Sequence, residues 1–549
     1  MKPVTSTSPS LDTTSNWVEK TFSSLNQEER IAQLIQVAAY SNRDDAHRQE
    51  ISALVYRYGI GGLTFFQDDA VKQVELTNYY QDKAKVPLMI SIDGEWGLAM
   101  RLKNTPFFPY QMLLGALSKD KLIYQMGAEI GRQCKRMGIH VNFAPAVDIN
   151  NNPNNPVINF RAFGEDKHKV AQKGISYMWG LQDQGVMACA KHFPGHGDTD
   201  VDSHLDLPVI PHKLERLEEV ELSPFQELIS HGVGSVMVSH LHVPALDSRP
   251  NLPATFSHHI ITKLLKEDWG YEGLIFTDAL DMKAVANMYP PEIVATKAIL
   301  AGNDILLNCE NVPKAIEEIK RAIQLGQISQ EEIDKRCKKV LAAKLWLGLD
   351  KYQPVETEGL EEELNSPKVH TLNYEIAKDA ITLISNKREV VPLSSHPQKL
   401  ACLAIGEEGI TDFQTILSRE TEVDHYHFSE QQNLIQPDSL MSQLGHYDKV
   451  LICVHADKMK STEAYGMHPS YYKLLEKLPS LSSVILIIFG NAYILSKIKH
   501  ATKCNGIMMA YQNSMYTQRA AVDVLTGKVL AAGSLPVNLG KGFPVGFRC

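Results

Sequence analysis

The sequence of 549 residues lacks the features that mark three other classes of protein. Its longest apolar runs, such as SVILIIFG at 483–490, are far too short to span a bilayer. It contains no block of Lys and Arg and has a formal net charge of −9, whereas nucleic-acid binding needs clustered positive charge. Its first residues have no apolar segment of a secretory signal and form a Ser/Thr/Pro-rich stretch that we expect to be disordered. We therefore expect a globular protein that neither spans a membrane nor binds nucleic acid.

Cysteine is scarce and scattered along the chain. The eight cysteines include no CxxC pair, and Cys189, Cys402 and Cys453 lie within apolar runs, where a buried free thiol is the expected state. Cysteine usage therefore leaves the cellular compartment open. The N-terminal stretch resembles what remains after a leader is removed, which favours a periplasmic or other extracytoplasmic location over a cytoplasmic one.

A series of short apolar runs alternates with helix-like segments between residues 31 and 310. Short, fully apolar strands that alternate with helices are typical of a parallel sheet covered on both faces. Eight such units in ~300 residues fit a (β/α)8 barrel. A doubly wound open sheet is the alternative, but no GxGxxG follows the first run. The eight runs are IQVAA (35–39), GGLTFF (61–66), PLMISID (87–93), HVNFAPAVD (140–148), VMACAKHF (186–193), SVMVSH (235–240), GLIFTDA (273–279) and DILLN (304–308).

A second, shorter series of apolar runs follows a charged, turn-rich stretch that we interpret as a linker. These runs are AITLISN (380–386), KLACLAIG (399–406), KVLICVH (449–455), SVILIIFG (483–490) and GIMMAYQ (506–512). The pattern predicts a smaller three-layer α/β/α sandwich domain. The predicted parts of the chain are a disordered tail (1–16), the (β/α)8 barrel (17–348), the linker (349–370) and the sandwich domain (371–549).

Titratable residues recur at the carboxyl ends of the predicted strands, where the active site of such a barrel lies. Asp93 ends the third run, Asp148 the fourth and His240 the sixth, while Lys191 and His192 lie in the fifth. A cap or a solvated side chain would explain one such residue. Convergence on five strands, the seventh run with Asp278 included, favours a site.

Asp278 directly follows the apolar run of GLIFTDAL, so its carboxylate is expected to face the mouth of the barrel. The alternative is an N-cap for the helix-like segment that follows, because Asp caps helices well. Asp281 is the better candidate for that cap.

The stretch KHFPGHGDTDVDSH (191–204) concentrates seven titratable side chains in one irregular loop. If residues 198–204 are extended, Asp198, Asp200, Asp202 and His204 form one row, with the carboxylate of Asp202 beside the imidazole of His204. Such a carboxylate orients the imidazole and favours its protonated form, which suits a general acid/base near neutral pH. Zinc binding is disfavoured because the histidine spacing matches no standard site, and no GxSxG elbow of a serine hydrolase is present. For His196, we favour a structural role in hydrogen bonding within the loop over a catalytic one. For Asp200, the alternative to a functional role is a carboxylate exposed to solvent.

Five segments together resemble glycoside hydrolase family 3, and more narrowly its β-N-acetylglucosaminidase branch. They are IDGEWG (92–97), NFAPAVDIN (142–150), NFRAFGE (159–165), KHFPGHGDTDVDSH (191–204) and TDAL (277–280). The resemblance covers essentially the whole chain, since two-domain members of this family join a (β/α)8 barrel to an α/β sandwich. One departure is Ala162, where Ser is the usual residue.

The resemblance implies a retaining mechanism without a metal or organic cofactor. It implies that Asp278 is the nucleophile and that His204 is the acid/base, with Asp202 as its partner. It also implies that four residues hold the hydroxyl groups of the sugar in the −1 subsite, namely Asp93, Arg161, Lys191 and His192.

The expected function is exo-acting removal of terminal β-linked N-acetylglucosamine (GlcNAc) from oligosaccharides or muropeptides derived from peptidoglycan or chitin. The alternatives are a β-glucosidase or β-xylosidase, a GlcNAc phosphorylase of the same family, and a non-catalytic sugar-binding protein. Because some bacterial relatives continue into a further domain, we also expect that an additional C-terminal domain is missing from this chain.

Overall fold

The computed structural model describes residue 9 and residues 11–203, 205–394, 399–430, 437–540 and 542–549. Residue contacts divide the chain into two compact units. The first unit comprises Met1–Phe108, Ile123–Ile149 and Ala171–Val369, and the second comprises Pro109–Leu122, Asn150–Val170 and His370–Cys549. Two segments that lie between barrel strands in the sequence therefore belong to the second unit by their contacts.

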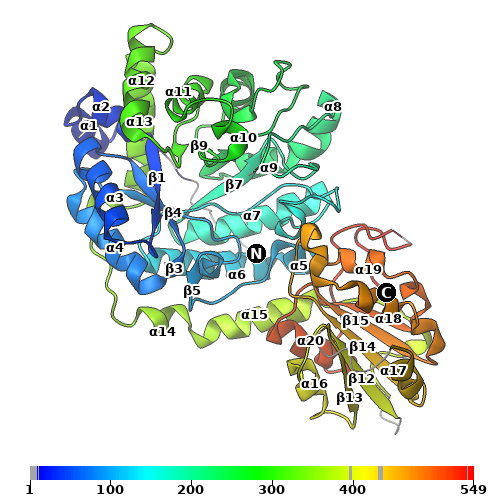
Figure 1. Ribbon diagram of the computed structural model, residues 1–549. Coiled ribbons are helices and arrows are strands. Elements are labelled where there is room, and N and C mark those ends of the chain that lie inside the picture. The colour runs from blue at the N-terminus through cyan, green and yellow to red at the C-terminus, as the bar shows by residue number, and fades with distance from the viewer. Residues whose placement is uncertain (1–8, 10, 204, 395–398, 431–436, 541) are drawn as a thin grey trace. The chain divides into compact units, whose positions relative to one another are not determined.

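The first unit is built on an eight-stranded parallel sheet with the order β10-β1-β2-β4-β6-β7-β8-β9 (Figure 1). A bridge between Phe276 and Ile305 joins the two ends of the sheet, so the predicted (β/α)8 barrel is confirmed. Each of the eight apolar runs contains one strand. The strands are β1 (Ile35–Tyr40), β2 (Gly62–Phe66), β4 (Met89–Ile92), β6 (Val141–Asn142), β7 (Met187–Phe193), β8 (Ser235–Val238), β9 (Leu274–Thr277) and β10 (Leu306–Leu307).

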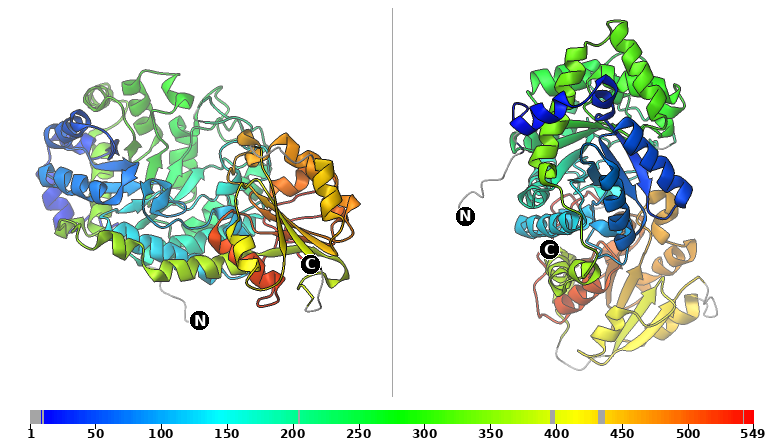
Figure 2. Two further views of the ribbon diagram at one scale, coloured as in Figure 1. Left: turned by 60° about the horizontal axis from the view of Figure 1, so that its bottom comes forward. Right: turned by 90° about the vertical axis from the view of Figure 1, so that its left-hand side faces the viewer.

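Helices surround this sheet in the views of Figures 1 and 2. In α6 the buried residues Ile123, Met126, Ile130 and Cys134 recur every three or four positions, which places them on one face. Burial of an Ile or Met side chain contributes about 1.5–3 kcal/mol, so this face holds the helix in place. The main helices are α3 (Asp45–Tyr58), α4 (Ala70–Lys83), α6 (Asp120–Arg136), α7 (Lys167–Asp183), α9 (Ser223–Ser230), α11 (Pro291–Ala301), α12 (Val312–Gln324) and α13 (Gln330–Trp346).

The second unit contains a six-stranded mixed sheet with the order β11-β16-β15-β14-β12-β13. All neighbours in this sheet are parallel except β11 and β16. The five predicted runs each contain a strand, but the edge strand β13 was not predicted. The strands are β11 (Thr382–Asn386), β12 (Leu400–Ile405), β13 (Asp424–Phe428), β14 (Lys449–His455), β15 (Val484–Phe489) and β16 (Gly506–Met509).

The helices of the second unit cover both faces of its sheet, as the three-layer prediction requires. The chain crosses from β12 to β13 in one direction and from β13 to β16 in the other. Right-handed crossovers therefore place α16 (Asp412–Leu417) on one face and α17 (Pro437–Leu444), α18 (Pro469–Leu475) and α19 (Tyr493–Lys497) on the other, as Figure 1 shows. Helix α20 (Met515–Leu525) packs beside α16. Within the described ranges, every helix is too short or too polar to cross a membrane.

Candidate active site

Charged residues from the carboxyl ends of β4 and β7 contact one another in the first unit. Asp93 follows β4 directly, and its carboxylate accepts hydrogen bonds from Lys191 at 2.9 Å and from Arg101 at 2.5 Å. Lys191 lies in β7, and its Nζ also contacts Glu95 Oε1 at 2.8 Å. Because Lys191 and Glu95 are both buried, the ammonium group is held between two carboxyl groups away from bulk water.

The charge state of Asp93 follows from these contacts. Burial alone would raise the pKa of its carboxyl group, but the charges of Lys191 and Arg101, together with their hydrogen bonds, hold that pKa well below its usual range. Asp93 is therefore ionised at neutral pH. An ionised carboxylate only accepts hydrogen bonds, which suits it to binding the hydroxyl groups of a ligand.

Asp148 fixes the orientation of His192 and of the chain that follows. This aspartate is fully buried, and its Oδ2 accepts a hydrogen bond from His192 Nδ1 at 2.8 Å. Its Oδ1 accepts the backbone N–H groups of His192 at 3.2 Å and His196 at 2.7 Å. Burial acts to raise the pKa of Asp148, but the two histidines lower it to about 2, so the carboxylate is ionised. His192 therefore carries a hydrogen on Nδ1, and its Nε2 is the nitrogen that Asp148 does not engage.

His196 has the structural role that the sequence favoured. Its ring is buried, with Nδ1 3.0 Å from the hydroxyl of Thr199 and Nε2 3.0 Å from that of Ser203. Burial lowers the pKa of His196 to about 4, so the ring is neutral at pH 7. Two hydroxyl groups of the loop are thereby tied to one imidazole.

The loop that carries Asp202 is made of turns and bends, so the extended row expected over residues 198–204 does not form. Asp198 instead contacts His212 at 2.8 Å, and Asp200 is exposed, as its solvated interpretation requires. Asp202 is half-buried. His204 lies outside the described residues, so its pairing with Asp202 stays a prediction. The stretch turns back on itself because the hydroxyl groups of Thr199 and Ser203 both bond to the ring of His196.

Asp278 follows β9 and is half-buried, as expected for a residue at the barrel mouth. Its backbone N–H donates to Val238 O at 2.9 Å, and its Oδ1 accepts the N–H of Ala279 at 2.8 Å. The alternative role as a helix cap is wrong for both aspartates, because the cap residue of the next helix, α10 (Lys283–Ala286), is Met282. Asp281 is exposed.

Arg161 belongs to the second unit, unlike the other predicted residues that the structure describes. It ends the short helix η2 (Asn159–Arg161), and its carbonyl accepts a hydrogen bond from Gln111 at 2.6 Å. The preceding Asn159 accepts a hydrogen bond from Asn491 at 2.7 Å, and both asparagines are buried. Of the predicted site residues that are described, five belong to the first unit and Arg161 belongs to the second. The five are Asp93, Lys191, His192, Asp202 and Asp278.

Four residues in the immediate surroundings had no role assigned to them from the sequence. Asp148 and His240 were counted among the titratable strand ends that indicate a site, while Glu95 lies in the quoted IDGEWG segment. Arg101 gave no signal of its own. Among the described residues, no group of three His, Cys, Asp or Glu side chains is arranged to hold a metal ion.

Comparison with known proteins gives consistent matches. The family model described as "Glycosyl hydrolase family 3 N terminal domain" matches residues 26–343, more than half of the chain. The chain is 34% identical over 388 residues to "Beta-hexosaminidase A" of Pseudoalteromonas piscicida, which covers 64% of this chain and 63% of that protein. The chain thus spans less than two thirds of the length of that relative. It is 28% identical to "Beta-N-acetylglucosaminidase/beta-glucosidase" of Cellulomonas fimi, over 69% of this chain and 68% of that protein.

A solved structure resembles the chain over both units. The glycoside hydrolase family 3 β-N-acetylglucosaminidase from Paenibacillus sp. str. FPU-7 has a TM-score of 0.78 and 30% sequence identity. The match covers 94% of this chain and 99% of that one.

Proposed function

The chain belongs to glycosyl hydrolase family 3, and from this membership we propose that it is a retaining exo-β-N-acetylglucosaminidase. Its substrates are terminal β-linked GlcNAc residues on oligosaccharides derived from peptidoglycan or chitin. The observation that carries the proposal is the carboxylate of Asp278, anchored at the carboxyl end of β9 in the same barrel as the Asp93–Lys191–His192 cluster. The names of the similar proteins support the choice of sugar.

In this proposal Asp278 attacks the anomeric carbon while protonated His204 donates its hydrogen to the leaving oxygen. The resulting glycosyl-enzyme is hydrolysed when neutral His204 takes a proton from water. Asp202 stabilises the protonated imidazole in the first step. Retaining enzymes require the two groups about 5 Å apart across the sugar, which a loop over the barrel mouth can supply.

The sugar is held through its hydroxyl groups. Asp93 accepts hydrogen bonds from them, and Lys191, whose Nζ is fixed by Asp93 and Glu95, donates to them. His192 is oriented by Asp148. From the family resemblance, Arg161 is also proposed to bind a hydroxyl group of the sugar.

β-Glucosidase activity is the second candidate. It is supported by the Cellulomonas fimi relative, whose name carries both activities. Discrimination between the two sugars depends on the acetamido group at C2 of GlcNAc.

The test is a comparison of initial rates on the 4-nitrophenyl β-glycosides of GlcNAc, glucose and xylose. We expect GlcNAc to be preferred, and Asp278→Ala to lower kcat by about 10⁴-fold or more, as removal of a nucleophile does. Asp281→Ala is the matched control, because Asp281 is an exposed aspartate three positions along the chain. The anomer formed first, followed by NMR, reports retention directly.

A preference for glucose or xylose would reject the sugar assignment. Activity in Asp278→Ala close to that of the parent would reject this residue as the nucleophile. Inverted product would reject the two-step mechanism.

A further inference from the structure

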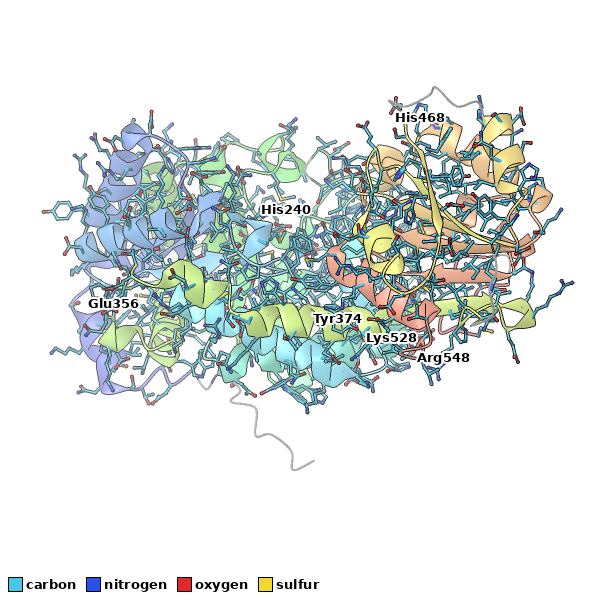
Figure 3. All side chains as sticks on the ribbon, turned by 90° about the horizontal axis from the view of Figure 1, so that it is seen from below. His240, Glu356, Tyr374, His468, Lys528 and Arg548 are labelled. Atoms are coloured by element: carbon cyan, nitrogen blue, oxygen red, sulfur yellow. The ribbon has the colours of Figure 1, made fainter. Side chains whose placement is uncertain are left out.

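His240 is a buried histidine that the proposed reaction does not use. It lies two residues beyond the end of β8, is fully buried and is labelled in Figure 3. Its Nε2 is 2.9 Å from the carbonyl oxygen of Ala279, and its Nδ1 is 2.7 Å from the hydroxyl of Thr255. Both nitrogens therefore have partners, and one of them is the backbone next to Asp278.

The hydrogen on Nε2 is fixed by its partner. A carbonyl oxygen only accepts hydrogen bonds, so Nε2 must donate to Ala279. Nδ1 can accept from Thr255 or donate to it, because that hydroxyl is also 2.9 Å from the carbonyl oxygen of Ser239. The bond to Ala279 is thus present in both protonation states of the ring.

This bond completes the anchoring of the chain around Asp278. The N–H of Asp278 donates to Val238, and the N–H of Ala279 donates to the Asp278 carboxylate. The next peptide group is held at both ends, since its N–H, from Leu280, donates to Leu307 O at 3.0 Å and its carbonyl accepts from His240. Among these hydrogen bonds, the one from His240 is made by a side chain that follows a different strand, β8.

We propose that His240 is a positioning residue for Asp278, acting through its Nε2 hydrogen bond to the carbonyl of Ala279. The inference rests on the proposed role of Asp278 as nucleophile. A loosened peptide after Asp278 lets its carboxylate rotate away from the anomeric carbon. Attack slows as a result, while binding of the sugar through Asp93, Lys191 and His192 is unaffected.

Two substitutions separate positioning from packing. In His240→Gln the side-chain amide reaches the place of Nε2 and can still donate to Ala279. In His240→Asn the amide reaches only the place of Nδ1. We expect His240→Asn to lower kcat by about 10- to 100-fold, the scale on which misplacement of a reacting group acts. We expect His240→Gln to retain most of the parent kcat, and both variants to bind GlcNAc with the parent Kd.

His242→Gln is the matched control. His242 is also a buried histidine on this segment, but its Nδ1 lies 3.4 Å from the carbonyl oxygen of Leu252 and not at the backbone beside Asp278. Its kcat is expected to equal that of the parent. Parent-like kcat in His240→Asn would overturn the inference, and so would an equal loss in the Gln and Asn variants.

If His240→Asn does not fold, Thr255→Val tests the same contact from the other side of the ring. It removes the hydroxyl group that holds the ring in orientation through Nδ1, so the ring can turn away from Ala279 and kcat is expected to fall. Thr255→Ser keeps the hydroxyl group and is expected to keep the parent kcat. Equal kcat in the two variants would contradict the inference. Asp278→Ala measured alongside keeps the outcomes distinct, because activity in that variant would reject the nucleophile itself.

Discussion

Among the described residues of the barrel, two pairs of aspartate and histidine, Asp148–His192 and Asp198–His212, have surroundings that give them different roles. In the first pair, ionised Asp148 is fully buried and makes three hydrogen bonds, one to the ring of His192 and two to backbone N–H groups. In the second pair, Asp198 contacts His212 at the same 2.8 Å, but both side chains are partly exposed. Exposed ion pairs contribute about 0–1 kcal/mol, whereas a buried carboxylate cannot lose its donors without a large cost. Only the first pair can hold a histidine ring rigidly.

Asp148→Asn is therefore expected to disturb ligand binding. An amide at this position can keep the two backbone hydrogen bonds through Oδ1, but its NH₂ group then faces the N–H of His192. The ring must move its hydrogen to Nε2 or turn away. We expect kcat/KM on 4-nitrophenyl β-GlcNAc to fall by about 10- to 100-fold, equivalent to one hydrogen bond to a charged group.

Asp198→Asn is the control for this substitution, since it changes the same atoms in a half-exposed pair of equal length. Equal kcat/KM values for Asp148→Asn and Asp198→Asn would show that Asp148 does not orient His192 for binding.

The loop after β7 owes its path to close backbone contact, which only glycine permits. A Cβ atom placed on Gly197 would lie 1.8 Å from the carbonyl oxygen of Ile149 and 2.4 Å from its carbonyl carbon. Ile149 directly follows Asp148, so the loop and the end of the β6 segment touch at this point. Backbone atoms cannot yield as a flexible side chain can, and any side chain at 197 must displace the loop that carries Asp202.

Gly197→Ala is expected to destabilise the protein by about 1–3 kcal/mol, as overpacking does, and to lower kcat as the loop shifts. Urea denaturation and initial rates measure the two effects. Gly409→Ala is the control, because nothing lies within 4 Å of a Cβ atom there. A fully stable and active Gly197→Ala would mean that the loop follows another path.

For helices and strands, the sequence predicted strands correctly where apolar residues are continuous and missed a strand where they are not. All eight barrel runs contain a strand, yet β6 has only two residues, and Pro145, which has no N–H to donate, lies three positions beyond its end. The edge strand β13, DHYHF, was missed since three of its five residues are polar and only one is buried. Strand ends located Asp93, Lys191 and Asp278, because parallel strands bring their carboxyl ends together. Partners such as Arg101, and the place of Arg161 in the second unit, depend on loop packing that no local pattern records.

Each unit has its own apolar interior, and the thiols of the chain are distributed through both. Seven cysteines are buried and Cys549 is exposed. Cys402 and Cys453 lie on neighbouring strands with their sulfur atoms 3.9 Å apart, well beyond the roughly 2.05 Å of a disulfide. Burial raises the pKa of five further thiols to about 12, so they are protonated as well as inaccessible; these are Cys134, Cys189, Cys309, Cys337 and Cys504.

Thiol titration therefore measures the integrity of the whole molecule. With 5,5′-dithiobis(2-nitrobenzoate) at pH 8, we expect Cys549 to react promptly in the native protein and all eight cysteines to react in denaturant. Cys549→Ser is expected to abolish the prompt phase and leave activity unchanged. A buried thiol can react only after the protein around it unfolds locally or globally. The slow phase of the thiol reaction therefore reports how often the surrounding core opens. Prompt reaction of a second thiol would show that one of the seven cysteines described as buried is accessible. Replacing each cysteine in turn would identify that thiol and the unit to which it belongs.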